Sequence, residues 1–181
     1  MIEIETKIEN VDLKDAVKAL EKNGAKFEGK KFFRRWIFNL EDKNGGERFV
    51  RLRTDGKKTT LTYKHRIGGG LANTEEIETE VNDFDTVAKI LSSIIPEPLY
   101  QESKRTVYSL DGAEITIDEW PKLPPIIEIE ADSEAKVKDT ISRLALKGNE
   151  LGNIGWEKVY LMHDMDLRSF KILKFDDKTE L

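Results

Sequence analysis

Residues 2–9 read Ile-Glu-Ile-Glu-Thr-Lys-Ile-Glu, a stretch in which apolar and charged side chains alternate. Side chains two positions apart on a β-strand point to the same side. The isoleucines therefore fall on one face, and Glu3, Glu5 and Lys7 fall on the other. This alternation predicts a strand with one apolar face and one charged face.

The same alternation recurs along the chain and sets the predicted fold. Asp55-Gly56 and Asp111-Gly112 separate alternating runs and are typical of tight hairpins. Between the strands lie amphipathic stretches that predict helices, the first with Asp12 as its N-cap and Gly24 at its end. We predict further strands at 31–40, 47–54, 58–66, 75–82, 102–110, 113–120 and 126–131, helices at 12–23, 83–94 and 133–146, and a short helical segment within 149–168.

Acidic and basic strand faces are segregated. Glu76, Glu78 and Glu80 share one strand face, and Arg51 and Arg53 share another. Like charges on one face repel each other, so solvent exposure alone explains this set less well than a charged interior that holds a cation and a polyanion. We therefore expect an α+β fold, an eight-stranded antiparallel closed β-barrel with the charged faces inward and amphipathic helices covering it. A single domain is expected over residues 1–170, followed by a loose tail over 171–181.

Composition narrows the chemistry further. The chain has 181 residues, 36% of them charged, with a net charge of −5, which does not favour nucleic acid as a partner. It has no cysteine and two histidines, so a metal would need oxygen ligands, as Mg²⁺, Mn²⁺ and Ca²⁺ do. The first ten residues do not read as a signal peptide, and no apolar run approaches the ~18 residues of a membrane span. We expect a cytoplasmic protein with no membrane partner.

An ordered series of motifs resembles one family. The series comprises Glu-Ile-Glu-Thr-Lys at 3–7, Arg-Leu-Arg at 51–53, Leu-Thr-Tyr-Lys at 61–64, Glu-Glu-Ile-Glu-Thr-Glu at 75–80, Lys-Arg-Thr-Val-Tyr at 104–108, Ile-Asp-Glu-Trp-Pro at 117–121 and Ile-Glu-Ile-Glu at 127–130. It is similar to the CYTH superfamily, the triphosphate tunnel metalloenzymes named for class IV adenylyl cyclases and thiamine triphosphatases.

The resemblance implies a site and a cofactor. It implies that a triphosphate-containing small molecule and Mg²⁺ or Mn²⁺ bind in the tunnel, with Lys7 and Glu5 as the catalytic pair and Glu78 and Glu80 in support. Lys104 and Arg105 point opposite ways on their strand, and we expect Arg105 to face inward. The substrate ligands are expected to be Lys7, Arg51, Arg53, Lys64, Arg66 and Arg105, and the metal ligands Glu3, Glu5, Asp118, Glu128 and Glu130.

One departure keeps three functions open. Many members carry an Asp-x-Tyr-Phe-Asp-like stretch where this chain reads Arg35-Trp36-Ile37-Phe38-Asn39, so Ile37 replaces a tyrosine that some hydrolases use near the attacking water. We favour a metal-dependent hydrolase of tripolyphosphate, thiamine triphosphate or a nucleoside triphosphate. The alternatives are an adenylate cyclase that converts ATP to cAMP and pyrophosphate, and a non-catalytic nucleotide- or polyphosphate-binding module. A homodimer is left open as its assembly.

Overall fold

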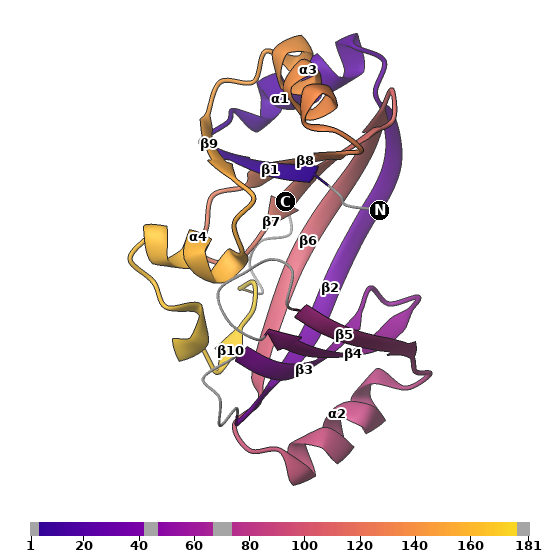
Figure 1. Ribbon diagram of the computed structural model, residues 1–181, viewed down its shortest axis with the longest axis vertical. Coiled ribbons are helices and arrows are strands. Elements are labelled where there is room, and N and C mark those ends of the chain that lie inside the picture. Colours follow the sequence, from indigo (N-terminus) through magenta and orange to yellow (C-terminus); the bar gives the residue numbers. More distant parts are fainter. Residues whose placement is uncertain (1–3, 42–46, 67–73, 177–181) are drawn as a thin grey trace. The chain divides into compact units, whose positions relative to one another are not determined.

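The computed structural model describes residues 4–41, 47–66 and 74–176 (Figure 1). The chain forms two compact units, each built from two separate segments. Unit 1 comprises Met1–Lys31 and Ser103–Leu167, and unit 2 comprises Phe32–Glu102 and Arg168–Leu181. Two long strands, β2 (Lys26–Leu40) and β6 (Leu99–Leu110), contribute residues to both units.

The remaining elements follow the predicted strands and helices closely. Asp12 caps the first helix as expected, because its carboxylate accepts hydrogen bonds from the backbone N–H groups of Lys14 and Asp15. The elements are β1 (Ile4–Glu9), α1 (Leu13–Lys22), β3 (Glu47–Thr54), β4 (Thr59–Arg66), β5 (Thr74–Glu80), α2 (Phe84–Ile94), β7 (Ala113–Glu119), β8 (Ile126–Ala131), α3 (Glu134–Leu144), β9 (Asn149–Gly152), α4 (Trp156–Met162), a 3₁₀ turn (Leu167–Ser169) and β10 (Ile172–Leu173).

The expected closed barrel of eight strands is wrong in two respects. Within the described residues the sheet has ten strands, in the order β5-β4-β3-β2-β6-β7-β8-β1-β9, with β10 paired to β6. This order begins at β5 and ends at β9, and these end strands do not pair with each other, so the sheet is open. The two additional strands, β9 and β10, have four and two residues, too few for an alternating pattern to be recognised. The α+β class is confirmed.

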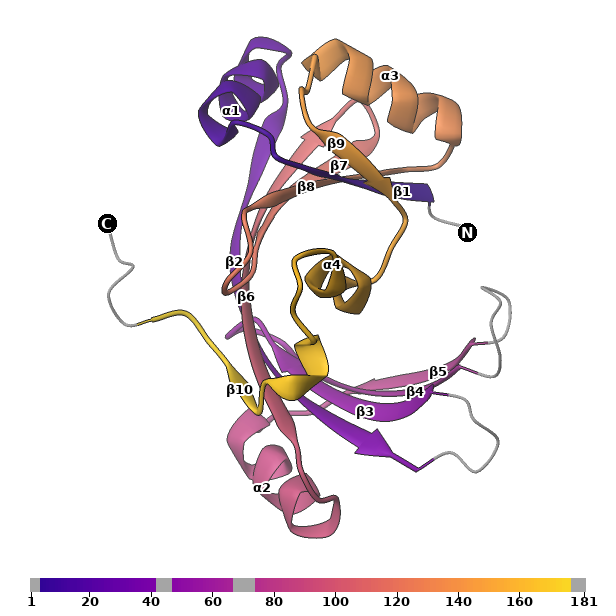
Figure 2. The same ribbon diagram turned by 90° about the vertical axis from the view of Figure 1, so that its left-hand side faces the viewer.

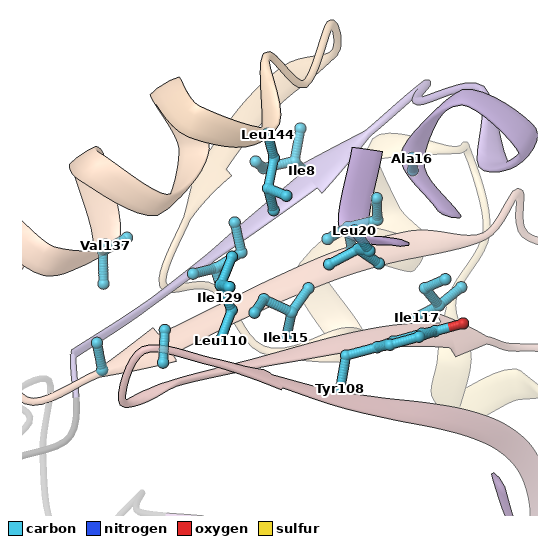
Figure 3. Packing of buried hydrophobic residues seen from close by; sticks show 13 residues of the cluster. Ile8, Ala16, Leu20, Tyr108, Leu110, Ile115, Ile117, Ile129, Val137 and Leu144 are labelled. Carbon is cyan, nitrogen blue, oxygen red and sulfur yellow. The ribbon is translucent and has the colours of Figure 1, made fainter. Parts of the chain in front are cut away.

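The apolar strand faces of unit 1 pack against α1 and α3. Figure 2 shows both helices on the same face of the strands β1, β7 and β8. Ile115 and Ile129 are fully buried in this core, and Leu20 from α1 and Val137 from α3 join them (Figure 3). The amphipathic helices thus cover the apolar face, as predicted, and leave the charged face of these strands on the other side.

Unit 2 repeats this arrangement with a single helix. Phe38 of β2 and Leu52 of β3 are fully buried against Phe84 and Ala88 of α2. Arg51 and Arg53 of β3 alternate with Leu52, and Lys64 of β4 shares their face through the strand register, so these cations lie on the face of the sheet that α2 does not cover.

The C-terminal segment pairs with β6. The predicted tail over 171–181 begins with β10, which pairs in parallel with Tyr100 and Gln101 of β6. Residues 177–181 lie outside the described residues.

Among the described helices, none has the length and apolar character needed to cross a membrane.

Candidate functional site

The charged face of unit 1 brings carboxylates from β1 and β8 together. The antiparallel register of these two strands pairs Glu5 with Glu130 and Lys7 with Glu128. Directly opposed residues of antiparallel strands lie on the same face with their Cβ atoms about 5 Å apart. Strand pairing therefore places side chains from distant parts of the sequence in contact.

Lys7 is at the centre of this group. Its side-chain nitrogen Nζ lies 2.7 Å from Glu128 Oε2 and 3.1 Å from Glu5 Oε1, and the residue is 3% exposed. Burial alone would lower the pKa of Lys7, but the charges and hydrogen bonds of Glu128 and Glu5 outweigh burial and raise it. Lys7 therefore stays protonated and holds both carboxylates.

Arg105 reaches the same carboxylates from β6. Its Nε and Nη2 donate to the two carboxylate oxygens of Asp118 at 2.6 and 2.7 Å, and Nη2 also donates to Glu128 Oε1 at 3.1 Å. Burial opposes the charged form of Arg105, but Asp118 and Glu128 raise its pKa. Burial raises the pKa of Asp118, while the hydrogen bonds from Arg105 and Thr116 act in the opposite direction. Glu128 thus joins Lys7 to Arg105.

These carboxylates fit a hard divalent cation. Glu5, Glu128 and Glu130 each offer an oxygen, and the three oxygens lie within 4.8 Å of one another. Mg²⁺ and Mn²⁺ prefer carboxylate oxygens. Glu5, Asp118, Glu128 and Glu130 outnumber the two basic side chains among them, Lys7 and Arg105, so acidic groups are in excess here.

Helix α4 lies on this charged face, opposite α1 and α3 (Figure 2). The Trp156 ring centre lies 6.0 Å from Lys7 Nζ and 4.7 Å from the ring centre of Trp120. The Tyr160 hydroxyl donates to the backbone oxygen of Pro121 at 2.7 Å. The helix therefore screens Lys7 from water and supplies the aromatic contact that the sequence pattern did not identify.

The basic residues of unit 2 share one face of their sheet. Register pairs Arg51 with Thr62 and Arg53 with Thr60 across β3 and β4. Arg51 Nη2 lies 3.5 Å from the Thr62 hydroxyl, which donates to Glu78 Oε2 at 2.6 Å. Burial lowers the pKa of Arg51, and the neighbouring charge of Arg53 lowers it further.

Acidic residues of β5 support some of these cations. Lys64 Nζ lies 2.8 Å from Glu76 Oε2, and Glu78 lies 3.8 Å from Arg51. Glu80 instead pairs with Lys58 of the β3–β4 turn. Glu78 therefore contacts a predicted substrate ligand, whereas Glu80 contacts a residue that the prediction did not include.

Arg51 Nε and Thr60 Oγ1 are buried polar atoms on this face, and neither has a hydrogen-bond partner among the described residues. Buried polar groups in proteins almost always have partners. Their position beside Arg53 fits a face that receives an anionic ligand.

Three further positions of the predicted site are Glu3, Arg66 and Ile37. Glu3 lies outside the described residues. Arg66 occupies the last position of β4, opposite Glu47. Ile37 lies opposite Arg51 across β2 and β3, so the position of the missing tyrosine is on the basic face. The prediction that the carboxylates of unit 1 and the cations of unit 2 serve one ligand remains a prediction.

Two charged residues of unit 2 that were not among the predicted site residues lie beside predicted substrate ligands. Glu76 supports Lys64, and Arg35 lies opposite Arg53 between β2 and β3. The alternating pattern placed both on strands, but the choice of a partner depends on the register between strands, which no local pattern shows.

A CYTH domain model matches residues 1–154. The match covers most of the chain, and the fold is an antiparallel sheet with charged faces. The chain is therefore a member of the CYTH domain family.

Comparison with individual proteins agrees with this family. The chain is 27% identical over 173 residues to the "Putative adenylate cyclase MJ0240" of Methanocaldococcus jannaschii, covering 93% of this chain and 99% of that protein. The PH1012 protein of Pyrococcus horikoshii has a similar fold, with a TM-score of 0.62 and 23% identity over 81% of this chain and 92% of that chain. An adenylyl cyclase-like protein of Hippeastrum, described as having a dominant triphosphatase activity, has a TM-score of 0.54 and 11% identity over 93% of this chain and 98% of that chain.

Proposed function

We propose that the chain is a divalent-metal-dependent hydrolase of a triphosphate substrate, such as tripolyphosphate, thiamine triphosphate or a nucleoside triphosphate. The observation that carries the proposal is the grouping of Glu5, Glu128 and Glu130 oxygens within 4.8 Å in a CYTH chain. The triphosphatase activity described for the Hippeastrum protein of similar fold supports the choice of reaction.

Each set of residues has a distinct part in this proposal. Glu5, Asp118, Glu128 and Glu130 would hold Mg²⁺ or Mn²⁺, together with Glu3. These residues would thereby bring a positive charge to the site that would stabilise the charge on phosphate oxygens during cleavage of the terminal P–O bond. The substrate ligands would be Lys7, Arg51, Arg53, Lys64, Arg66 and Arg105, whose positive charges favour the polyanion.

Lys7 and Glu5 are the proposed catalytic pair. Of the two carboxylates that Lys7 contacts, the Glu5 side chain is 26% exposed and that of Glu128 is 8% exposed. Glu5 is thus the partner that water reaches, and it can accept a proton from an attacking water. Lys7 Nζ, 3.1 Å from Glu5, can orient that water by donating a hydrogen bond.

A phosphate-release assay tests the proposal. We expect phosphate release from tripolyphosphate, thiamine triphosphate or ATP with Mg²⁺ or Mn²⁺ present, and none with a chelator. Glu5→Gln and Glu130→Gln should reduce turnover at least a hundredfold, because each removes a charged ligand. Glu114→Gln is the matched control. Glu114 lies opposite Glu130 on the same face, but it is exposed and is not one of the three glutamates whose oxygens lie within 4.8 Å of one another.

A second candidate is an adenylate cyclase, favoured by the similarity to the Methanocaldococcus protein of that name. Chromatography of the ATP reaction distinguishes the two, since cyclisation yields cAMP and pyrophosphate. Tight binding of tripolyphosphate and ATP without turnover of any substrate would contradict both enzymes and favour a binding module. This third outcome is consistent with isoleucine at position 37.

A further inference from the structure

Two adjacent arginines of β2 serve opposite faces of the sheet in unit 2. The guanidinium carbon of Arg34 lies 4.7 Å from the ring centre of Phe84, and its Nη1 lies 3.7 Å from Asp85. Arg34 therefore belongs to the side covered by α2. Arg35 lies opposite Arg53 in the register of β2 and β3, on the basic face.

Arg35 and Arg53 flank one aromatic ring. Their guanidinium carbons lie 5.8 and 5.4 Å from the ring centre of Phe33. Cation–π contacts at this distance are favourable, but like charges opposed across two strands repel each other. The ring thus holds two positive charges in a place where their mutual repulsion calls for a negative charge.

No carboxylate in the described ranges forms an ion pair with Arg53. The positive charge of Arg53 instead lowers the pKa of Arg51. Thr60, opposite Arg53 on β4, is 6% exposed. Its hydroxyl has no hydrogen-bond partner within the part of the chain that the structure describes. Two guanidiniums and a buried hydroxyl therefore meet in one place.

We propose that Arg35 and Arg53 form a clamp for one phosphate group of the substrate, with Phe33 fixing both guanidiniums and the Thr60 hydroxyl as a further donor. This inference rests on the proposed function, because the phosphate belongs to the same triphosphate ligand. It adds Arg35 as a binding residue at a position where many CYTH members have aspartate. The planar guanidinium suits phosphate because it can donate two parallel hydrogen bonds.

Calorimetric titration of the whole chain with tripolyphosphate tests the clamp. We expect Arg35→Gln and Arg53→Gln each to raise Kd about tenfold or more, as for the loss of a hydrogen bond to a charged group. Arg35→Lys, which keeps the charge and loses the fork, should weaken binding to an intermediate extent. Arg34→Gln is the matched control, since it changes the net charge equally on the neighbouring residue, and we expect its Kd within twofold of the wild type.

The outcomes separate the clamp from the proposed function. Weak binding by Arg53→Gln with unchanged binding by Arg35→Gln refutes the clamp and leaves the triphosphate proposal intact. Equal weakening by Arg34→Gln and Arg35→Gln also refutes it, because the effect would then be one of general charge. Failure of the folded wild type to bind tripolyphosphate would overturn the proposed function and the clamp together. If Arg35→Gln does not fold, Arg35→Lys and Thr60→Val decide the matter, and both must weaken binding.

Discussion

Asp118 and Arg105 show how a single residue pair supports the charged face of unit 1. Asp118 is 2% exposed and accepts two hydrogen bonds from the guanidinium of Arg105. An ion pair of this kind is fixed by geometry, and removing one member leaves the other charge partly buried and unpaired. The pair therefore contributes to stability even when no metal is present.

Replacing Asp118 tests this contribution. We expect Asp118→Ala to lower the free energy of unfolding by about 3 kcal/mol, because Arg105 loses its bidentate partner inside the protein. Urea unfolding in the presence of a chelator measures the effect without any contribution from metal. Glu114→Ala, on the same face of β7 but exposed, should change the stability by about 0.5 kcal/mol or less. Equal losses in the two variants would contradict the role of the pair.

Gly148 lies where unit 1 leaves no room for a side chain. A Cβ atom at this position would lie 2.4 Å from the backbone oxygen of Glu9 and 2.7 Å from Val11 Cγ2. The strand end of β1 must therefore move if any larger residue is present. The packing role of Gly148 is visible only in the tertiary structure.

We expect Gly148→Ala to destabilise the protein by about 2 kcal/mol or more, since the backbone of β1 must shift. Thermal and urea unfolding measure the loss. Gly155→Ala is the control, because a Cβ atom at Gly155 would have no other atom within 4 Å and the φ of this residue is negative. Because Gly155 is the N-cap of α4 and alanine is a poorer N-cap than glycine, its effect should be about 1 kcal/mol or less. A Gly148→Ala protein as stable as Gly155→Ala would show that this region is looser than the structure indicates.

At the scale of elements, α2 begins with a charge-dependent cap. Asp83 Oδ1 accepts a hydrogen bond from the backbone N–H of Thr86 at 2.9 Å, and this bond lowers the pKa of Asp83 below its ordinary value of 3.8. The helix buries Phe84 and Ala88 against the sheet, so its cap is linked to the core of unit 2.

The cap predicts a pH dependence of stability. Because the folded-state pKa is depressed, the ionised cap stabilises the protein above pH 3.8, and this contribution is lost as the pH falls through 3.8 and the lower folded-state value. Asp83→Asn keeps an acceptor oxygen but does not titrate. The stability difference between wild type and Asp83→Asn, measured by urea unfolding from pH 7 to about pH 2.5, should therefore shift against the wild type as the pH falls. A difference that stays constant over this range would contradict the assignment.

At the scale of the whole molecule, a metal ion would act on stability through unit 1. Its proposed ligands come from β1, β7 and β8, and β1 is distant in sequence from the other two strands, so the complete set is close only in the folded chain. A ligand that binds only the folded state stabilises it by mass action.

We expect Mn²⁺ at a hundred times its Kd to raise the free energy of unfolding by about 2.7 kcal/mol, seen as a higher Tm. Glu130→Gln should lose most of this increase, and Glu114→Gln should keep it. Titration with Mn²⁺ alone, followed by thermal unfolding, needs no substrate and no activity. A Tm that does not respond to Mn²⁺ or Mg²⁺ would contradict the assignment of the metal ligands and would not affect the description of the fold.

Local patterns in the sequence determined which residues form strands and which side of each strand is charged. Glu5 with Lys7 and Arg51 with Arg53 follow from the two-residue period alone, and the amphipathic helices follow from their apolar stripes. The same period places Lys104 and Arg105 on opposite faces of their strand, and Arg105 is the one that contacts Asp118. These features depend only on residues that are near one another in the sequence, so they can be predicted from the sequence.

Only the tertiary structure decided the partners and the extent of the sheet. Glu76 beside Lys64 and Arg35 opposite Arg53 depend on the register between strands, which is set by contacts between distant segments rather than by local sequence. The open ten-stranded order likewise depends on which strands pair. The short strand β9 pairs with β1 and β10 pairs with β6, and neither pairing can be inferred from a local pattern. Strand faces are local properties of a chain, whereas register and closure depend on contacts between segments that are distant in sequence.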